Sequence, residues 1–273
     1  MERMLQLGPL ALPWGLLILL AGWQLGNLLH ERLSARLGLA SGPHAWRLTL
    51  AALLTARLGF VLRYAAEYGA APWSVLDIRD GGWQPWAGLG AALLYAAVLW
   101  LRRSAWRRPV AAGVAMFTAA WLAGQVLLLA TAPATTAALP DWRGLALDAR
   151  PIALPELRGQ PVVLNLWTSW CPPCRREMPV LLQARGEQTG VRFLWVNQGE
   201  SAEIVARFAD RQGLPAADVL LDTESRLGRG LGHSALPTTL FYDAQGRLKA
   251  VRAGELSAGS LAHHLAQITA PSP

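Results

Sequence analysis

Two cysteines separated by two prolines, Cys171 and Cys174, are the residues of this sequence whose types and spacing could carry out covalent chemistry. They follow an apolar run rich in β-branched residues at 162–169, which predicts a buried strand, and they precede a segment of strong helix formers. Cys171 is therefore expected at a helix N-terminus, where unpaired backbone N–H groups and the helix dipole favour an anion. The thiolate is the attacking species in thiol–disulfide exchange, so this position suits a redox cysteine.

Other uses of a Cys-x-x-Cys pair agree less well with the rest of the chain. A zinc site would need further ligands, but the chain has no other cysteine, and His233, His263 and His264 lack the spacing of ligands. A purely structural disulfide would close too short a loop to restrict the unfolded chain much. We therefore predict a redox-active dithiol, with no metal and no cofactor.

The residues around the pair resemble the thioredoxin-like proteins of the TlpA and ResA type. The resemblance rests on Val-Val-Leu-Asn-Leu-Trp-Thr-Ser-Trp-Cys-Pro-Pro-Cys-Arg-Arg-Glu-Met-Pro at 162–179, Val-Asn-Gln-Gly-Glu-Ser at 196–201 and Leu-Pro-Thr-Thr-Leu-Phe at 236–241. It implies a thioredoxin fold and a periplasmic thiol–disulfide oxidoreductase. Trp170, Pro172 and Pro173 are then supporting residues beside the cysteines.

The same resemblance implies roles for residues distant in sequence. Pro237 would be a cis-proline facing the cysteines, with Thr238 after it, and its exposed backbone edge would pair with a client peptide; the alternative is an ordinary trans-proline. Asn165 stands where many thioredoxins bury an aspartate, and an asparagine cannot accept a proton. Glu200 is then expected to exchange protons with Cys174; the alternative is an exposed residue before the next helix.

Charge and hydropathy divide the chain into two halves. Residues 1–130 hold 11 Lys/Arg against 5 Asp/Glu, whereas residues 131–273 hold 14 against 13. The sequence pI of 10.4 therefore comes from the first half, where it indicates membrane orientation rather than nucleic-acid binding. The second half has no basic run interleaved with aromatic residues, so no nucleic-acid partner is expected.

Four apolar stretches are long enough to span a bilayer, which predicts an α-helical transmembrane bundle of about four spans. These stretches are 10–29, 48–64, 86–101 and 110–130. The first is interpreted as a retained span, because its charged start is weak and its apolar core is too long for a signal peptide. The first and third loops carry most of the arginines: Arg32, Arg36, Arg47, Arg102, Arg103, Arg107 and Arg108. By the positive-inside rule these loops are cytoplasmic, so the N-terminus and the cysteine-containing half lie on the periplasmic side of a bacterial inner membrane.

Part of the first half resembles prolipoprotein diacylglyceryl transferase. The matching segments are Ala-Arg-Leu-Gly-Phe-Val at 56–61 and Asp-Gly-Gly-Trp-Gln-Pro-Trp-Ala-Gly-Leu at 80–89, but Pro85 and Trp86 stand where that family has a His-Gly pair. The missing histidine argues against lipid transfer and implies a reused membrane scaffold. Arg57 within a span is costly; it is either functional or paired with Asp77, Asp80 or a lipid phosphate.

The predicted organisation is a transmembrane anchor at 1–130, a small-residue and proline-containing linker at 131–139, and an α/β thioredoxin-like domain at 140–273. The predicted function is reduction of disulfides in periplasmic client proteins, for example in cytochrome c maturation, with re-reduction by a membrane-bound dithiol donor of DsbD/CcdA type. The lipid bilayer is a further expected partner. Two alternatives stay open: a disulfide oxidase or isomerase of the same fold, and a lipid-modifying transferase with a redox appendage.

Overall fold

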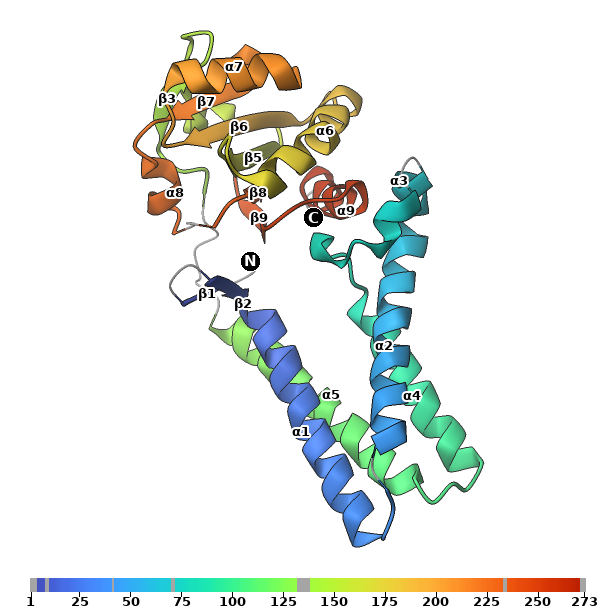
Figure 1. Ribbon diagram of the computed structural model, residues 1–273. Helices are drawn as coiled ribbons and strands as arrows, with labels where there is room; N and C mark the ends of the chain where they lie inside the picture. Colours follow the sequence, from blue (N-terminus) through green and yellow to red (C-terminus); the bar gives the residue numbers. More distant parts are fainter. Residues whose placement is uncertain are drawn as a thin grey trace.

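The computed structural model describes residues 4–7, 10–40, 42–69, 72–131, 138–232 and 235–270. Within them the chain forms a helical half and an α/β domain, which lie at opposite ends of an elongated molecule (Figure 1). Most of the predicted linker, residues 132–137, lies outside the described residues, as does His233.

Four long helices make up the helical half, one at each apolar stretch of the sequence. They are α1 (Trp14–Arg36), α2 (Gly42–Arg63), α4 (Pro85–Leu101) and α5 (Arg107–Ala130). Helix α1 packs along α5, and α2 packs along α4 (Figure 1). Glycines permit this close approach, because a Cβ atom added at Gly26 would lie 2.7 Å from the carbonyl oxygen of Gly113, and one at Gly88 would lie 2.8 Å from that of Ala52.

The helices differ in whether they could cross a membrane. Among the described residues, two helical segments are long and apolar enough, Pro43–Arg63 and Arg107–Ala130, and Pro85–Leu101 is a shorter apolar helix. The predicted start of the first span at residue 10 is wrong, because β1 (Met4–Leu7) and β2 (Leu10–Pro13) form an antiparallel hairpin. Pro13 explains the boundary, since the residue before a proline is disfavoured in a helix.

The loop between α2 and α4 is organised around Arg57. It contains α3 (Ala65–Gly69) and the 3₁₀ turns η1 (Pro72–Leu76) and η2 (Ile78–Asp80). Arg57 is buried; its Nη1 donates to Asp80 Oδ1 at 2.8 Å, its Nε donates to the carbonyl oxygen of Val75 at 3.0 Å, and its Nη2 donates to that of Asp77 at 3.0 Å. Of the alternatives left open for Arg57, the structure therefore shows the pairing with Asp80.

Replacing Arg57 is expected to destabilise the helical half strongly. Arg57→Met leaves the Asp80 carboxylate buried without its cation, which costs about 3–5 kcal/mol, and should lower the melting temperature of the detergent-solubilised chain by about 10 °C. Arg63→Met, at the exposed end of the same helix, is the control and should leave the melting temperature nearly unchanged. Equal effects of the two variants would contradict the structural role of Arg57.

The second half contains a seven-stranded sheet in the order β4-β3-β7-β6-β5-β8-β9. The strands are β3 (Arg143–Ala146), β4 (Pro151–Ala153), β5 (Val162–Trp167), β6 (Arg192–Gln198), β7 (Val219–Asp222), β8 (Thr238–Tyr242) and β9 (Leu248–Ala253). Strands β5, β6 and β7 are parallel, and β8 runs antiparallel to both β5 and β9. This arrangement confirms the predicted thioredoxin-like α/β fold.

Helices cover the two faces of this sheet unequally. The helices are α6 (Pro172–Glu187), α7 (Ala202–Gln212), α8 (Arg226–Gly230) and α9 (Ala258–Thr269), with the 3₁₀ turns η3 (Leu154–Leu157) and η4 (Ala216–Asp218). Helices α6, α7 and α9 share one apolar cluster with the aromatic side chains of β5 and β6, where the ring centroids of Trp167 and Phe208 lie 4.9 Å apart. The cluster on the other face receives Leu154 of η3 and Leu227 of α8. The buried β5 thus leads into α6, where the cysteines are.

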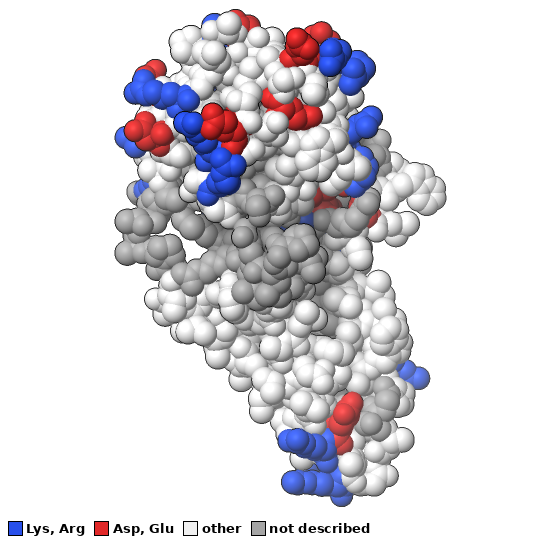
Figure 2. Space-filling model, turned by 60° about the vertical axis from the view of Figure 1, so that its left-hand side comes forward, with Lys and Arg blue, Asp and Glu red and all other residues white. Residues whose placement is uncertain are grey.

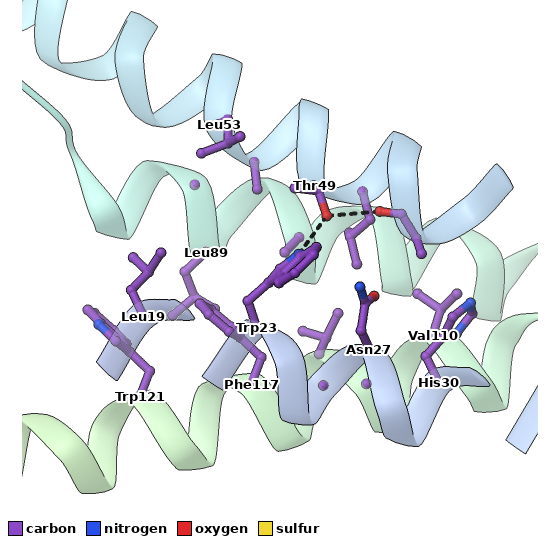
Figure 3. Close-up of a pocket in the computed structure, with 18 of the residues that line it drawn as sticks. Leu19, Trp23, Asn27, His30, Thr49, Leu53, Leu89, Val110, Phe117 and Trp121 are labelled. Atoms are coloured by element: carbon purple, nitrogen blue, oxygen red, sulfur yellow. Dashed lines mark hydrogen bonds between the residues drawn. The ribbon is translucent and has the colours of Figure 1, made fainter. Parts of the chain in front are cut away.

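A cavity of about 160 Å³ lies between the two helix pairs of the helical half (Figure 3). Its lining is mainly apolar, and Trp23 Nε1 donates to Thr49 Oγ1 at 3.0 Å across the gap between α1 and α2. The described lining residues include no cysteine and no acid, so the cavity offers no group for thiol–disulfide exchange.

Candidate active site

The two cysteines lie where β5 gives way to α6. Cys171 is the N-cap of α6, and its Sγ accepts a hydrogen bond of 3.2 Å from the backbone N–H of Cys174. The pair forms a disulfide with an S–S distance of 2.08 Å. Cys171 is 4% exposed, whereas Cys174 is fully buried. Cys171 is thus the slightly more exposed residue of the pair; its role as the attacking thiol stays a prediction.

The chain neighbours of Cys171 are apolar. Trp170, directly before Cys171, has 69% of its surface exposed. Pro172 and Pro173 form the first positions of α6, where a proline costs no hydrogen bond. These three apolar residues thus flank Cys171 in the sequence, and their supporting role stays a prediction.

The peptide bond between Leu236 and Pro237 is cis, as predicted for this residue; its part in client binding stays a prediction. Thr238, the first residue of β8, is paired with Leu166 near the end of β5. Strands β5 and β8 are antiparallel. The end of β5, which leads to Cys171, therefore lies at the same end of the sheet as the start of β8, which follows Pro237. The structure therefore brings the predicted cis-proline to the side of the sheet that carries the cysteines.

Glu200 is buried, so the alternative of an exposed residue before the next helix is wrong. Its carboxylate accepts hydrogen bonds from the backbone N–H of Ser169 at 2.7 Å and from the Ser169 hydroxyl at 2.5 Å. Asn197 Nδ2 donates to it at 2.6 Å. Glu200 therefore links the end of β6 to the loop that carries Cys171. Its part in proton exchange stays a prediction.

A second buried acid, Glu177, lies on α6 one turn after Cys174. Its Oε1 accepts a hydrogen bond of 2.8 Å from Asn165 Nδ2, and its Oε2 accepts one of 3.1 Å from the backbone N–H of Leu256. Burial raises the pKa of Glu177 to about 8, and the nearby Glu255 also raises it. The two hydrogen bonds and the positive charge of Arg252 act in the opposite direction.

Sequence reasoning overlooked Glu177, although this residue is part of the motif around the cysteines. Two signals could have identified it. Glu177 follows Cys174 by one helical turn, which puts both side chains on one face of α6. Asn165, in the middle of a fully buried strand, also needs a polar partner in the core. The acid that many thioredoxins carry on the strand is here supplied by the helix.

The described histidines of α9 make contacts within the protein. His263 Nδ1 lies 2.8 Å from the Tyr64 hydroxyl of the helical half. The ring centroid of His264 lies 4.8 Å from that of Phe241. Both contacts are structural.

The sheet order, the cysteine pair at the start of α6 and the cis-proline beside it define a thioredoxin-like redox protein. Residues 132–251 match the AhpC/TSA family. Thiol-disulfide oxidoreductase ResA of Geobacillus thermodenitrificans is 35% identical over 140 residues, which are 50% of this chain and 80% of that protein. The chain belongs to this family of ResA-type thiol–disulfide oxidoreductases and is an enzyme of that class.

Two further proteins resemble the chain. Thiol:disulfide interchange protein DsbE of Escherichia coli (strain K12) is 33% identical over 100 residues, which are 37% of this chain and 53% of that protein. The solved structure of a thiol:disulfide interchange protein from Chlorobium tepidum TLS has 26% identity and a TM-score of 0.45, and covers 50% of this chain and 99% of its own.

Proposed function

We propose that this chain is a membrane-anchored enzyme that reduces disulfides of periplasmic client proteins through Cys171 and Cys174. One observation carries the proposal: a disulfide-bonded cysteine pair lies at the start of α6, with Cys171 slightly exposed as its N-cap and Cys174 fully buried, and Glu177, whose carboxyl has a raised pKa, follows one turn later on the same helix. This arrangement separates an attacking thiol from a resolving thiol that needs a proton acceptor.

The reaction runs in two exchange steps. The Cys171 thiolate attacks one sulfur of the client disulfide, forms a mixed disulfide and releases the other client sulfur as a thiolate, which takes up a proton. Cys174 gives its proton to Glu177, attacks the Cys171 sulfur and releases the second client thiolate. Two electrons pass to the client, and the enzyme is left with the Cys171–Cys174 disulfide. A membrane-bound dithiol donor of DsbD/CcdA type returns it to the dithiol form.

The direction of exchange is tested by the reduction potential of the pair. The potential is measured by equilibrating the chain with glutathione. If the chain is a reductant, the reduction potential of its cysteine pair should lie near that of thioredoxin, about −270 mV. A value near that of DsbA, about −120 mV, would instead establish the alternative of a disulfide oxidase. Identifying proteins trapped by a Cys174→Ser chain would then test whether the clients belong to cytochrome c maturation.

The distribution of charge supports a membrane location. Charged residues gather on the thioredoxin-like domain and at the far end of the helical half, and the visible surface between them is largely uncharged (Figure 2). The far end is where the loops α1–α2 and α4–α5 lie (Figure 1). The arginines that predict a cytoplasmic side lie in these loops and at the ends of the helices that flank them. The thioredoxin-like domain is then periplasmic. Protease added to spheroplasts should therefore digest this domain but not the two arginine-rich loops.

The transferase-like segments are proposed to serve as scaffold. The described contacts of Arg57 are to Asp80, to carbonyl oxygens of the loop between α2 and α4, and to the Tyr68 ring, which leaves its guanidinium committed to structure. Pro85 and Trp86, which stand where the transferase family has its His-Gly pair, are the first residues of α4. A lipid-modifying activity is therefore the disfavoured alternative.

Glu200→Gln is expected to slow disulfide exchange several-fold at neutral pH while the fold stays intact. The carboxamide cannot accept all the hydrogen bonds that Ser169 and Asn197 donate, and it cannot take up a proton. The measurement is the pH–rate profile with a model disulfide, and Glu203→Gln, exposed at the start of α7, is the control. If the pH–rate profiles of Glu200→Gln and the wild type were indistinguishable, the predicted part of Glu200 in proton exchange would be ruled out.

A further inference from the structure

The helical half does not only precede the thioredoxin-like domain in sequence; it contacts the domain directly. Helix α3 and the end of α2 lie beside α9 (Figure 1). The Tyr68 ring packs so closely on Gly259 that a Cβ atom added there would lie 2.7 Å from Tyr68 Cε2. We call this contact the junction; it consists of Tyr64, Tyr68 and Asp80 from the helical half and Ser257, Gly259 and His263 from the domain.

Asp80 is the polar centre of the junction. It is 3% exposed, and its carboxylate is held by Arg57 and by the backbone N–H of Gly82 at 2.9 Å. Asp80 Oδ2 also accepts hydrogen bonds of 2.8 Å from the Tyr68 hydroxyl and 2.8 Å from the Ser257 hydroxyl. The helical half thus presents a fixed, buried carboxylate to one hydroxyl group of the domain. Buried charged groups hold their partners strongly, because leaving them unpaired is costly.

Ser257 connects this carboxylate to the redox site. It is the N-cap of α9 and forms a capping box with Ser260. The residue before it, Leu256, donates its backbone N–H to Glu177 Oε2 at 3.1 Å. The short segment 254–257 between β9 and α9 is therefore held from outside by Asp80 and from inside by Glu177.

The surroundings of Glu177 make it sensitive to the position of this segment. Leu256 N–H is one of two hydrogen-bond donors to its carboxylate; the other is Asn165, on β5. The charged groups facing Glu177 are Glu255 and Arg252, and both lie on or next to the segment. Arg252 also approaches the junction, because a Cβ atom added at Gly81 would meet its guanidinium group.

We propose that the helical half is a positioning element of the redox site: Asp80, through Ser257, fixes the Leu256 N–H on Glu177 and so sets how readily Glu177 takes the proton of Cys174. Asp80 and Ser257 are positioning residues, since neither touches the reacting sulfurs. The inference rests on the proposed function, in which Glu177 is the proton acceptor of Cys174. When the junction opens, the segment moves away and the ionised form of Glu177 loses a donor. Proton transfer from Cys174 then requires a higher pH.

The test uses the reduced full-length chain in lipid nanodiscs, with oxidised glutathione as the probe disulfide. Gly259→Ala puts a methyl group against the Tyr68 ring, and in a helix alanine is more favourable than glycine by about 1 kcal/mol, so α9 itself is not weakened. Gly186→Ala is the matched control, because it is the same change in α6 with no atom within 4 Å of the added Cβ. Asp80→Asn opens the junction from the other side; if that variant does not fold, Gly259→Ala carries the test.

We expect Gly259→Ala and Asp80→Asn to move the midpoint of the pH–rate profile upward and to slow exchange at pH 7 at least threefold, with Gly186→Ala unchanged. If the junction variants had the same pH–rate profile as the wild type, or if Gly186→Ala shifted the midpoint equally, the inference would be overturned while the proposed function stood. A wild-type chain that reduces no glutathione disulfide at any pH would overturn the proposed function itself, and the inference with it.

Discussion

Cys174→Ser in the full-length chain is expected to accumulate mixed disulfides with client proteins, whereas Cys171→Ser is expected to abolish exchange. Cys171 caps α6 and is the more exposed residue of the pair, so we expect its thiolate to be the one that reaches a client. Without Cys174 the mixed disulfide has no thiol to resolve it. Non-reducing electrophoresis of membranes that carry each variant would show adducts for Cys174→Ser alone.

The order of the two steps can be checked without a client. In the reduced wild-type chain, iodoacetamide at neutral pH should label Cys171 faster than Cys174, which is fully buried. Labelling under denaturing conditions is the control for equal intrinsic reactivity. Faster labelling of Cys174 in the folded chain would reverse the assignment.

Glu177→Gln is expected to slow exchange by about a hundredfold, the lower end of what a positioned general base contributes. The fully buried carboxyl of Glu177 has its pKa raised to about 8, so it can take a proton near neutral pH, and a carboxamide cannot. Glu187→Gln, exposed at the end of the same helix, is the control. The measurement is the rate of mixed-disulfide resolution as a function of pH.

The same substitution should change how stability depends on pH. The pKa of Glu177 is higher in the folded state than in the unfolded state, so the folded oxidised chain binds more protons between about pH 4.5 and about pH 8. The free energy of unfolding of the wild type should therefore fall as pH rises through this window, by about 5 kcal/mol in total. Glu177→Gln removes this fall. Parallel stability curves for the two chains would show that Glu177 does not titrate as described.

Local patterns predicted much of the redox domain. The apolar run before Cys171 and the helix formers after Cys174 define β5 and α6, and the turn at Gly246 marks the hairpin of β8 and β9. Pro237 and Glu200 were found through the resemblance to a family rather than through their spacing. Their burial and partners depend on strands that meet only in the folded sheet.

Contacts between distant segments could not be predicted in the same way. Asp80 and Ser257 are 177 positions apart, and nothing in either local sequence indicates that one accepts a hydrogen bond from the other. The region between the two halves was therefore expected to be a simple linker. The helical half was predicted only as apolar stretches, because the pairing of α1 with α5 depends on close contacts such as that of Gly26 with Gly113.

The junction joins two surfaces that already belong to one chain. It can therefore stay closed with a much weaker intrinsic affinity than a contact between separate molecules would need. Only the connection between α5 and β3 ties the halves covalently, and a short connection gives the two surfaces an effective concentration on the order of millimolar. A contact with a Kd of about 0.1 mM between separate molecules would then be about nine-tenths closed within the chain. The same halves produced separately and mixed at micromolar concentration would remain almost entirely apart.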